Sequence, residues 1–251
     1  MGRKYKNPSI IEVVCELQFS PDSPWDATIP GLIYERVRQT FPKKMQETVL
    51  TVHVPAGNTP VVLGMPQLQP EERLRFVQPD ERAFVQLGRH LLAINQLAPY
   101  PSWERYLPLI EQIFNSYQSV AEPTGIHRIG LRYINRIPIR KRDFQASDYF
   151  TLYPQISSEL PSTYGGFLTQ VLFPYEQERD VLKIEVIAGA DEMQQGSVIF
   201  LDLDYFLARP GAVSPDEALD WVINAHTNVE HAFESCITEQ LRQQMDQEAS
   251  S

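Results

Sequence analysis

The segment from Ile126 to Ile139 constrains the fold of this chain more than any other, because charge and hydrophobicity alternate along it. Arg128, Arg132 and Arg136 occupy even positions, and Arg140 continues the series. Most odd positions from 129 to 139 are aliphatic or aromatic. A period of two is that of a β-strand, whose successive side chains point to opposite faces. The pattern therefore predicts a strand with one apolar face and with the arginines together on the other.

Two interpretations of this arginine face remain open. Residues 123–251 hold 10 basic and 19 acidic side chains, and six of the basic ones fall between positions 128 and 142. In the first interpretation the arginines pair across the sheet with Glu185, Asp202 and Asp204, whose strands come later in the chain. In the second, they form a surface that binds an anion such as a phosphate, or the carboxylates of a partner, because guanidinium groups suit both.

The same carboxylates allow a different chemistry. Glu185, Asp202 and Asp204 on adjacent strands could hold Mg²⁺, as in metal-dependent hydrolases and nucleases. Lys183 precedes Glu185, which reverses the familiar nuclease order, and the nearby arginines would compete for the same oxygens. His226 and His231 lie five residues apart on a predicted helix and so point in different directions. The sequence thus predicts no resident cofactor and leaves the metal site as an alternative.

The rest of the chain separates into helical and extended segments. In the first half we expect a strand over 9–20, a helix capped by Thr28 over 28–41, strands over 48–54, 61–65, 73–78 and 82–97, and a helix from Ser102 with Pro108 inside it. The second half continues with the 126–139 strand, a short helix over 143–153, and strands over 166–174, 181–188 and 197–207. Ser214 and Glu217 form a capping box for a final helix with an apolar stripe to Leu241, after which fraying is expected.

Each half thus reads as strand, helix, several strands and helix. We predict an α+β fold made of internally duplicated β-α-βn-α units, with antiparallel sheets and helices packed on one face. The repeats would span 1–121 and 126–245, followed by a flexible tail over 246–251. The arrangement is loosely like that of TATA-binding protein or of helix-grip proteins, an analogy that carries no function.

Composition narrows the classes further. No apolar run approaches the roughly 20 residues that cross a bilayer, so no membrane partner is expected. Cys15 and Cys236 both lie within apolar patterns and predict buried thiols in a reducing compartment, which favours a cytoplasmic protein. The net charge of −10 disfavours nucleic-acid binding by the chain as a whole.

Three segments carry a resemblance to a known group of proteins. They are Tyr5-Lys6-Asn7-Pro8-Ser9-Ile10-Ile11-Glu12, the strand that begins at Arg128, and the helix over 226–237. These segments resemble an uncharacterised, sporadically distributed prokaryotic family that opens with a Tyr-Lys-Asn-Pro-Pro-Ile-like stretch, in which Ser9 here replaces the second proline. The resemblance implies a bacterial or archaeal origin and an accessory role in defence or toxin–antitoxin loci, and it supplies no catalytic residues.

These observations favour a non-enzymatic interaction or ligand-binding module over an enzyme. The sequence has no Gly-rich phosphate loop, G-x-S-x-G elbow, C-x-x-C pair or H-E-x-x-H helix. We expect the arginine face, Arg128, Arg132, Arg136 and Arg140, to hold a protein partner or a small anionic ligand, and copies of the chain to be capable of forming a homodimer. The alternative is the metal-dependent hydrolase or nuclease.

Overall fold

A computed structural model describes residues 3–53, 67–139, 144–161, 165–191 and 196–246. The strands are β1 (Ile10–Phe19), β2 (Lys43–His53), β3 (Gln67–Val77), β4 (Ala83–Gly88), β5 (Leu91–Leu97), β6 (Ile126–Ile139), β7 (Gly166–Tyr175), β8 (Asp180–Asp191) and β9 (Gly196–Leu207). The helices are α1 (Ile29–Val37), α2 (Trp103–Ala121), α3 (Ala146–Tyr149), the 3-10 turn η1 (Pro215–Glu217), α4 (Ala218–Cys236) and α5 (Glu239–Asp246). The predicted mixture of helices with an antiparallel sheet is confirmed.

All nine strands belong to one antiparallel sheet, in the order β2-β3-β4-β5-β1-β6-β9-β8-β7. The first strands of the two halves, β1 and β6, pair with each other at the centre. The two predicted repeats, 1–121 and 126–245, therefore contribute their strands to one shared sheet and do not form separate sheets. The strand expected over 61–65 lies outside the described residues, as does most of the predicted tail.

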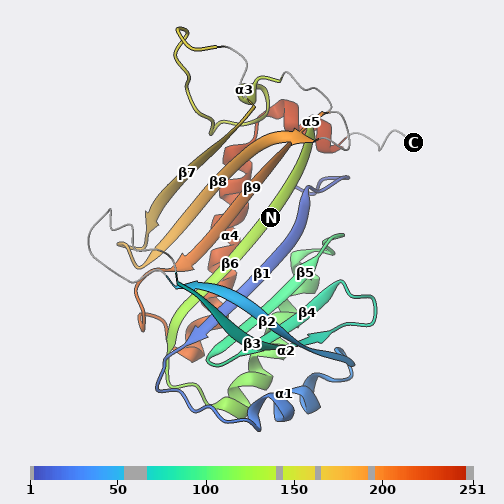
Figure 1. Cartoon of the computed structure of the whole chain (residues 1–251), viewed down its shortest axis with the longest axis vertical. Helices are drawn as coiled ribbons and strands as arrows, with labels where there is room; N and C mark the ends of the chain where they lie inside the picture. The colour runs from blue at the N-terminus through green and yellow to red at the C-terminus, as the bar shows by residue number, and fades with distance from the viewer. Residues whose placement is uncertain (1–2, 54–66, 140–143, 162–164, 192–195, 247–251) are drawn as a thin grey trace.

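Two of the helices, α2 and α4, pack against the sheet. α2 contacts β5, and α4 contacts β6 and β9; Figure 1 shows both helices behind the sheet. Cys15, Leu131 and Leu203, each followed by a charged residue along β1, β6 and β9, are fully buried in the core under these helices. We call the opposite face, which carries Arg132 and Asp204, the open face.

The open face is not equally open along the sheet. Phe84, Leu91 and Ala93 of β4 and β5 are 2–6% exposed, yet they lie on the open face and outside the main core. In Figure 1, β2 and β3 cross in front of this part of the sheet, on the side away from α2. Here Arg75 of β3 lies over the Phe84 ring, with its Cζ 3.5 Å from the ring centroid. The first half of the sheet thus covers its own open face.

A buried carboxylate fixes α4 to β8. Asp180 has no solvent exposure, and its oxygens accept hydrogen bonds from Trp221 Nε1 at 3.0 Å and from Tyr205 Oη at 3.2 Å. Arg179 completes the set with an ion pair of 2.7 Å. Buried charges persist only where such partners satisfy them, so this group sets the position of α4 on the sheet.

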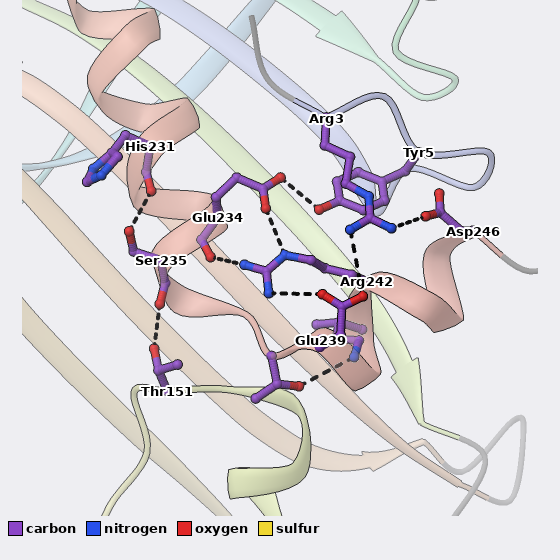
Figure 2. Close-up of polar contacts among 11 residues, drawn as sticks. Arg3, Tyr5, Thr151, His231, Glu234, Ser235, Glu239, Arg242 and Asp246 are labelled. Atoms are coloured by element: carbon purple, nitrogen blue, oxygen red, sulfur yellow. Dashed lines mark hydrogen bonds and ion pairs between the residues drawn. The ribbon is translucent and has the colours of Figure 1, made fainter.

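The first described residues are fastened to the last helices, as Figure 2 shows. Tyr5 Oη donates to Glu234 Oε1 at 2.7 Å, and Arg242 Nε donates to the other oxygen of Glu234 at 2.9 Å. Arg3 forms an ion pair with Asp246 at 2.5 Å. The N-terminal segment is therefore held against α4 and α5 before it enters β1.

Two details of the helices differ from expectation. Thr28 is the N-cap residue of α1, as predicted, but its side chain makes no capping hydrogen bond; Asp26 Oδ1 instead accepts from the backbone N–H groups of Thr28 and Ile29 at 2.7 and 3.3 Å. The final helix does not run unbroken to Leu241. Ile237 adopts an extended conformation and forms an antiparallel bridge with Phe150, which buries Ile237 and separates α4 from α5. The Ser214–Glu217 capping box is confirmed.

Both cysteines are buried free thiols, as predicted. Burial raises the pKa of the Cys15 thiol to about 12 and that of Cys236 to about 11, so both remain protonated at neutral pH. Within the described residues, no helix combines the length and apolar character needed to cross a membrane.

Candidate interaction surface

β6 presents its arginines at the centre of the sheet, between β1 and β9. Arg128, Arg132 and Arg136 alternate with buried residues and share the open face, as the period-two pattern predicted. Tyr133 and Ile137 point the other way into the core. Arg140 lies outside the described residues.

Arg132 binds Asp202 with both arms of its guanidinium group. Arg132 Nε lies 2.8 and 3.1 Å from the two Asp202 oxygens, and its Nη2 contacts the same carboxylate. The direct register partner of Arg132 is Asp204, so the side chain reaches diagonally along β9. The Asp202 side chain is 7% exposed, whereas that of Arg132 is 43% exposed. The pair therefore has a buried acidic end and a basic end that meets solvent.

Arg128 bridges two strands. Its guanidinium lies 3.1 Å from Glu16 of β1 and 3.1 Å from Asp204 of β9. Gly130, two residues after Arg128 on β6, makes this bridging position possible, because a Cβ at residue 130 would lie 2.8 Å from Arg128 Nη1. The glycine thus leaves the space in which the arginine lies flat along its own strand.

The electrostatics of this ion-pair group reflect partial burial. Burial raises the pKa of Asp204, and Arg128, Arg132 and Lys183 offset part of that rise. Burial likewise raises the pKa of Glu12, with Arg132 acting in the opposite direction. The hydrogen bonds from Arg132 to Asp202 raise the pKa of the guanidinium, which keeps it charged. The positive charges at the centre of the open face are thus matched by carboxylates.

The structure brings together only some of the residues singled out in the sequence. Asp202 and Asp204 do pair with arginines, as the first interpretation requires. Glu185 is the register partner of Asp202, but it joins none of the ion pairs found among the described residues. The sequence analysis did not identify Glu16 of β1 as part of this group. Its even position, like that of Glu12, places it on the polar face of the strand. Nothing local in the sequence showed that β1 and β6 are neighbours.

Apolar side chains continue the open face beyond the ion pairs. Leu168 of β7, Ile187 of β8, Phe200 of β9 and Arg136 of β6 follow one another across the sheet in register. Leu168 is 61% exposed and Ile187 is 37% exposed. Exposed apolar residues that adjoin one another and are bordered by charges are typical of binding surfaces.

His226 lies on the opposite side of the sheet and belongs to the packing of the helices. Its ring stacks on Trp103 of α2 with centroids 3.9 Å apart, and its Nδ1 is 3.1 Å from Tyr133 Oη. Burial lowers the pKa of His226, which favours the neutral imidazole. The described residues contain no group of three or more His, Cys, Asp or Glu side chains placed to hold a metal ion.

A comparison of the chain with models of known protein families gives no match, and a comparison with curated proteins gives none either. The resemblance to a prokaryotic family therefore rests only on the three sequence segments named above.

Proposed function

We propose that this chain is a non-enzymatic interaction module that binds a protein partner on the open face of β6, β9 and β8. The observation that carries the proposal is the position of Ile187, 37% exposed, on the same face as the solvent-facing guanidinium of Arg132. An apolar contact surrounded by a polar, ion-paired rim is the usual composition of a protein-binding surface.

The ion pairs favour a protein over a small anion as the occupant. Arg128 and Arg132 already bind Glu16, Asp202 and Asp204. A free phosphate could reach only the exposed edge of Arg132 unless it displaced these carboxylates; it would gain no apolar contact there, and the chain's net charge of −10 would repel it. A protein partner can instead pack on Ile187 and offer a single carboxylate to the exposed edge of Arg132. Arginine and aliphatic contacts together then supply the binding energy.

The metal-dependent alternative has less support. It needs the oxygens of Asp202 and Asp204 as ligands, and both carboxylates accept hydrogen bonds from arginines. A cation would therefore have to separate Arg132 from a nearly buried aspartate. Losing these hydrogen bonds costs about 1–3 kcal/mol, because the solvent exposure of Arg132 moderates the loss.

A matched pair of variants tests the proposed surface. Ile187 on the open face and Ile223 on α4 have the same side chain and similar exposure, 37% and 41%. Wild-type, Ile187→Lys and Ile223→Lys chains would each be used as bait in an extract of the native host. We expect a protein that the wild type and Ile223→Lys retain and that Ile187→Lys loses. Its binding would then be confirmed with the two purified components.

Capture of the same proteins by all three baits, or of none by the wild type, would contradict the proposal. Thermal unfolding in the presence of Mg²⁺, Mn²⁺ or inorganic phosphate tests the other occupants. We expect none of them to raise the melting temperature. A rise that grows with the logarithm of metal concentration, and that Asp204→Asn abolishes, would favour the hydrolase instead.

We also infer that the two halves arose by internal duplication. Moving outward from the central β1–β6 pair, the first half continues as β5, β4, β3 and the second as β9, β8, β7. Each half thus places its first strand beside its last one, with β2 as an addition to the first half. This mirrored order supports the duplication that the order of elements along the chain predicted.

A further inference from the structure

The outer edge of β7 differs from the rest of this acidic molecule. β7 is the last strand of the sheet and lies outermost on one side of it in Figure 1. Its ten residues, Gly166–Tyr175, include no charged side chain, although the chain carries a net charge of −10. An edge strand offers unpaired backbone groups to any strand that approaches, and charges are the common means of preventing this.

Apolar side chains are exposed on both faces of the same strand. Leu168 and Leu172 on the open face are 61% and 56% exposed, and Phe173 on the other face is 40% exposed. The values for Leu168 and Leu172 are among the highest for large apolar residues in the described part of the chain. A long, uncharged strand with apolar groups on both faces is expected to pair with another strand.

The other edge of the sheet shows what a protected edge looks like in this protein. β2 begins with Lys43 and Lys44 and continues to Glu47. Lys43 forms an ion pair with Glu81 at 2.6 Å, and Lys44 lies over the Tyr34 ring. Charged side chains thus mark one end of the sheet and are missing from β7.

The sequence of β7 is complementary to itself. If two copies are paired antiparallel about Gln170, Leu168 of each copy lies opposite Leu172 of the other. On the other face Phe167 lies opposite Phe173, and Thr169 lies opposite Val171. Apolar side chains then meet apolar ones, and the two Gln170 side chains meet at the axis. Opposed apolar and aromatic pairs are the arrangements that stabilise antiparallel strands.

We propose that two copies of this chain form a symmetric dimer by antiparallel pairing of β7 with β7, with the two-fold axis at Gln170. The occupant is a second copy because the contact needs no complementary charge. Any acidic contact between two such chains would be repulsive. An axis perpendicular to the sheet extends it from one copy into the next and leaves both open faces on the same side. This inference goes beyond the partner surface proposed above and does not depend on it.

Charge at the axis tests the dimer without disturbing the monomer. Gln170 is exposed, so Gln170→Glu and Gln170→Lys should both fold normally. Each variant places like charges opposite each other in its own dimer and should raise the dissociation constant on the order of tenfold or more. An equimolar mixture of the two should restore association. Sedimentation of the purified full chain across the micromolar range measures both effects, and Gln240→Glu on α5 serves as the control.

Cysteine cross-linking tests the register. Cys15 and Cys236 are buried, so an introduced exposed thiol should dominate the reaction. Gln170→Cys should form a covalent dimer on mild oxidation, because opposed Cα atoms in an antiparallel pair are at disulfide distance. Leu168→Cys should cross-link best when mixed with Leu172→Cys. A wild-type chain that stays monomeric across the micromolar range would overturn the proposal. So would a dimer whose stability ignores charge at position 170.

Discussion

The two halves of the sheet treat the same face in opposite ways. On the open face of the first half, Leu91 is 4% exposed and Ala93 is 2% exposed, whereas Leu168 in the second half is 61% exposed. The first half has an additional strand, β2, which together with β3 crosses in front of its own open face. The presence of β2 and β3 over the first half thus explains why the open face is covered there and remains exposed in the second half.

The closed half also indicates what a partner of the open half would look like. The covering strand β3 brings Arg73 and Arg75 to the face, and Arg75 contacts the Phe84 ring while Arg73 forms an ion pair with Glu71 at 2.8 Å. Cover of this kind combines ion pairs with contacts to apolar side chains. A protein partner that contacts Ile187 and Arg132 would repeat that chemistry in trans.

The most direct way to break the comparison is to truncate the same residue type on the open face of each half. Leu91→Ala should lower the free energy of unfolding by about 2–4 kcal/mol, because it leaves a cavity under β2 and β3. Leu168→Ala should change it by about 0.5 kcal/mol or less in dilute protein, where mass action removes any contribution from dimers. Urea denaturation of both variants measures the difference. Equal losses would mean that the open face is equally covered in the two halves.

A second variant tests how far the open half depends on its ion pairs. Arg132→Gln leaves Asp202, with its side chain 7% exposed, without its guanidinium partner. We expect a loss of about 1–3 kcal/mol, moderated by the solvent exposure of Arg132. The double variant Arg132→Gln/Asp202→Asn should recover part of this loss. Strictly additive effects in the double-mutant cycle would show that the two side chains are not coupled.

A third, smaller effect concerns His226, which lies where α4 packs against α2 on the opposite side of the sheet. Burial lowers the pKa of His226, with Glu230 and Glu104 partly opposing it. The unfolded chain therefore takes up a proton below pH about 6.5 while the folded chain resists it. The free energy of unfolding should thus be highest above that pH and decrease as the pH falls below it. Denaturation at several pH values should show a weaker decrease in His226→Gln than in the wild type.

The smallest expected effect lies at the junction of the halves. Gly130→Ala places a Cβ where the Arg128 guanidinium lies, so the ion pairs to Glu16 and Asp204 must lengthen. The loss should stay within about 1 kcal/mol, since a flexible side chain can move and alanine reduces the entropy of the unfolded chain. In an Arg128→Gln background the same substitution should be neutral or stabilising. An equal cost in both backgrounds would contradict this account of Gly130.

The sequence predicts those features that depend on local periodicity. The alternation over β6 is regular enough to give both the strand and the shared face of Arg128 and Arg132. The Arg128–Glu16 ion pair joins residues 112 positions apart, and it follows from the pairing of β1 with β6, which no local pattern reveals. Asp202 and Asp204 were found because their strand shows its own period-two spacing.

The break between α4 and α5 and the exposure of β7 escaped prediction for related reasons. The apolar stripe continues through Ile237, so periodicity alone gives one helix, and only the bridge to Phe150 interrupts it. β7 has the composition of a buried strand, yet it ends the sheet. Position in a sheet depends on the order in which strands pair, and that order is a property of the whole chain.

The contact between Arg3 and Asp246 has a practical consequence for engineering. Because the Arg3 guanidinium lies 2.5 Å from the Asp246 carboxylate and Asn7 N donates to Met245 O at 2.9 Å, a short peptide could join the first and last described segments with little loss of chain entropy. The turn between β4 and β5, at Arg89 and His90, is a candidate for new ends, since it connects adjacent antiparallel strands. A circular permutant opened there would start with β5, the strand that pairs with β1. The strands would then be synthesised in a new order, while their order in the sheet would stay the same.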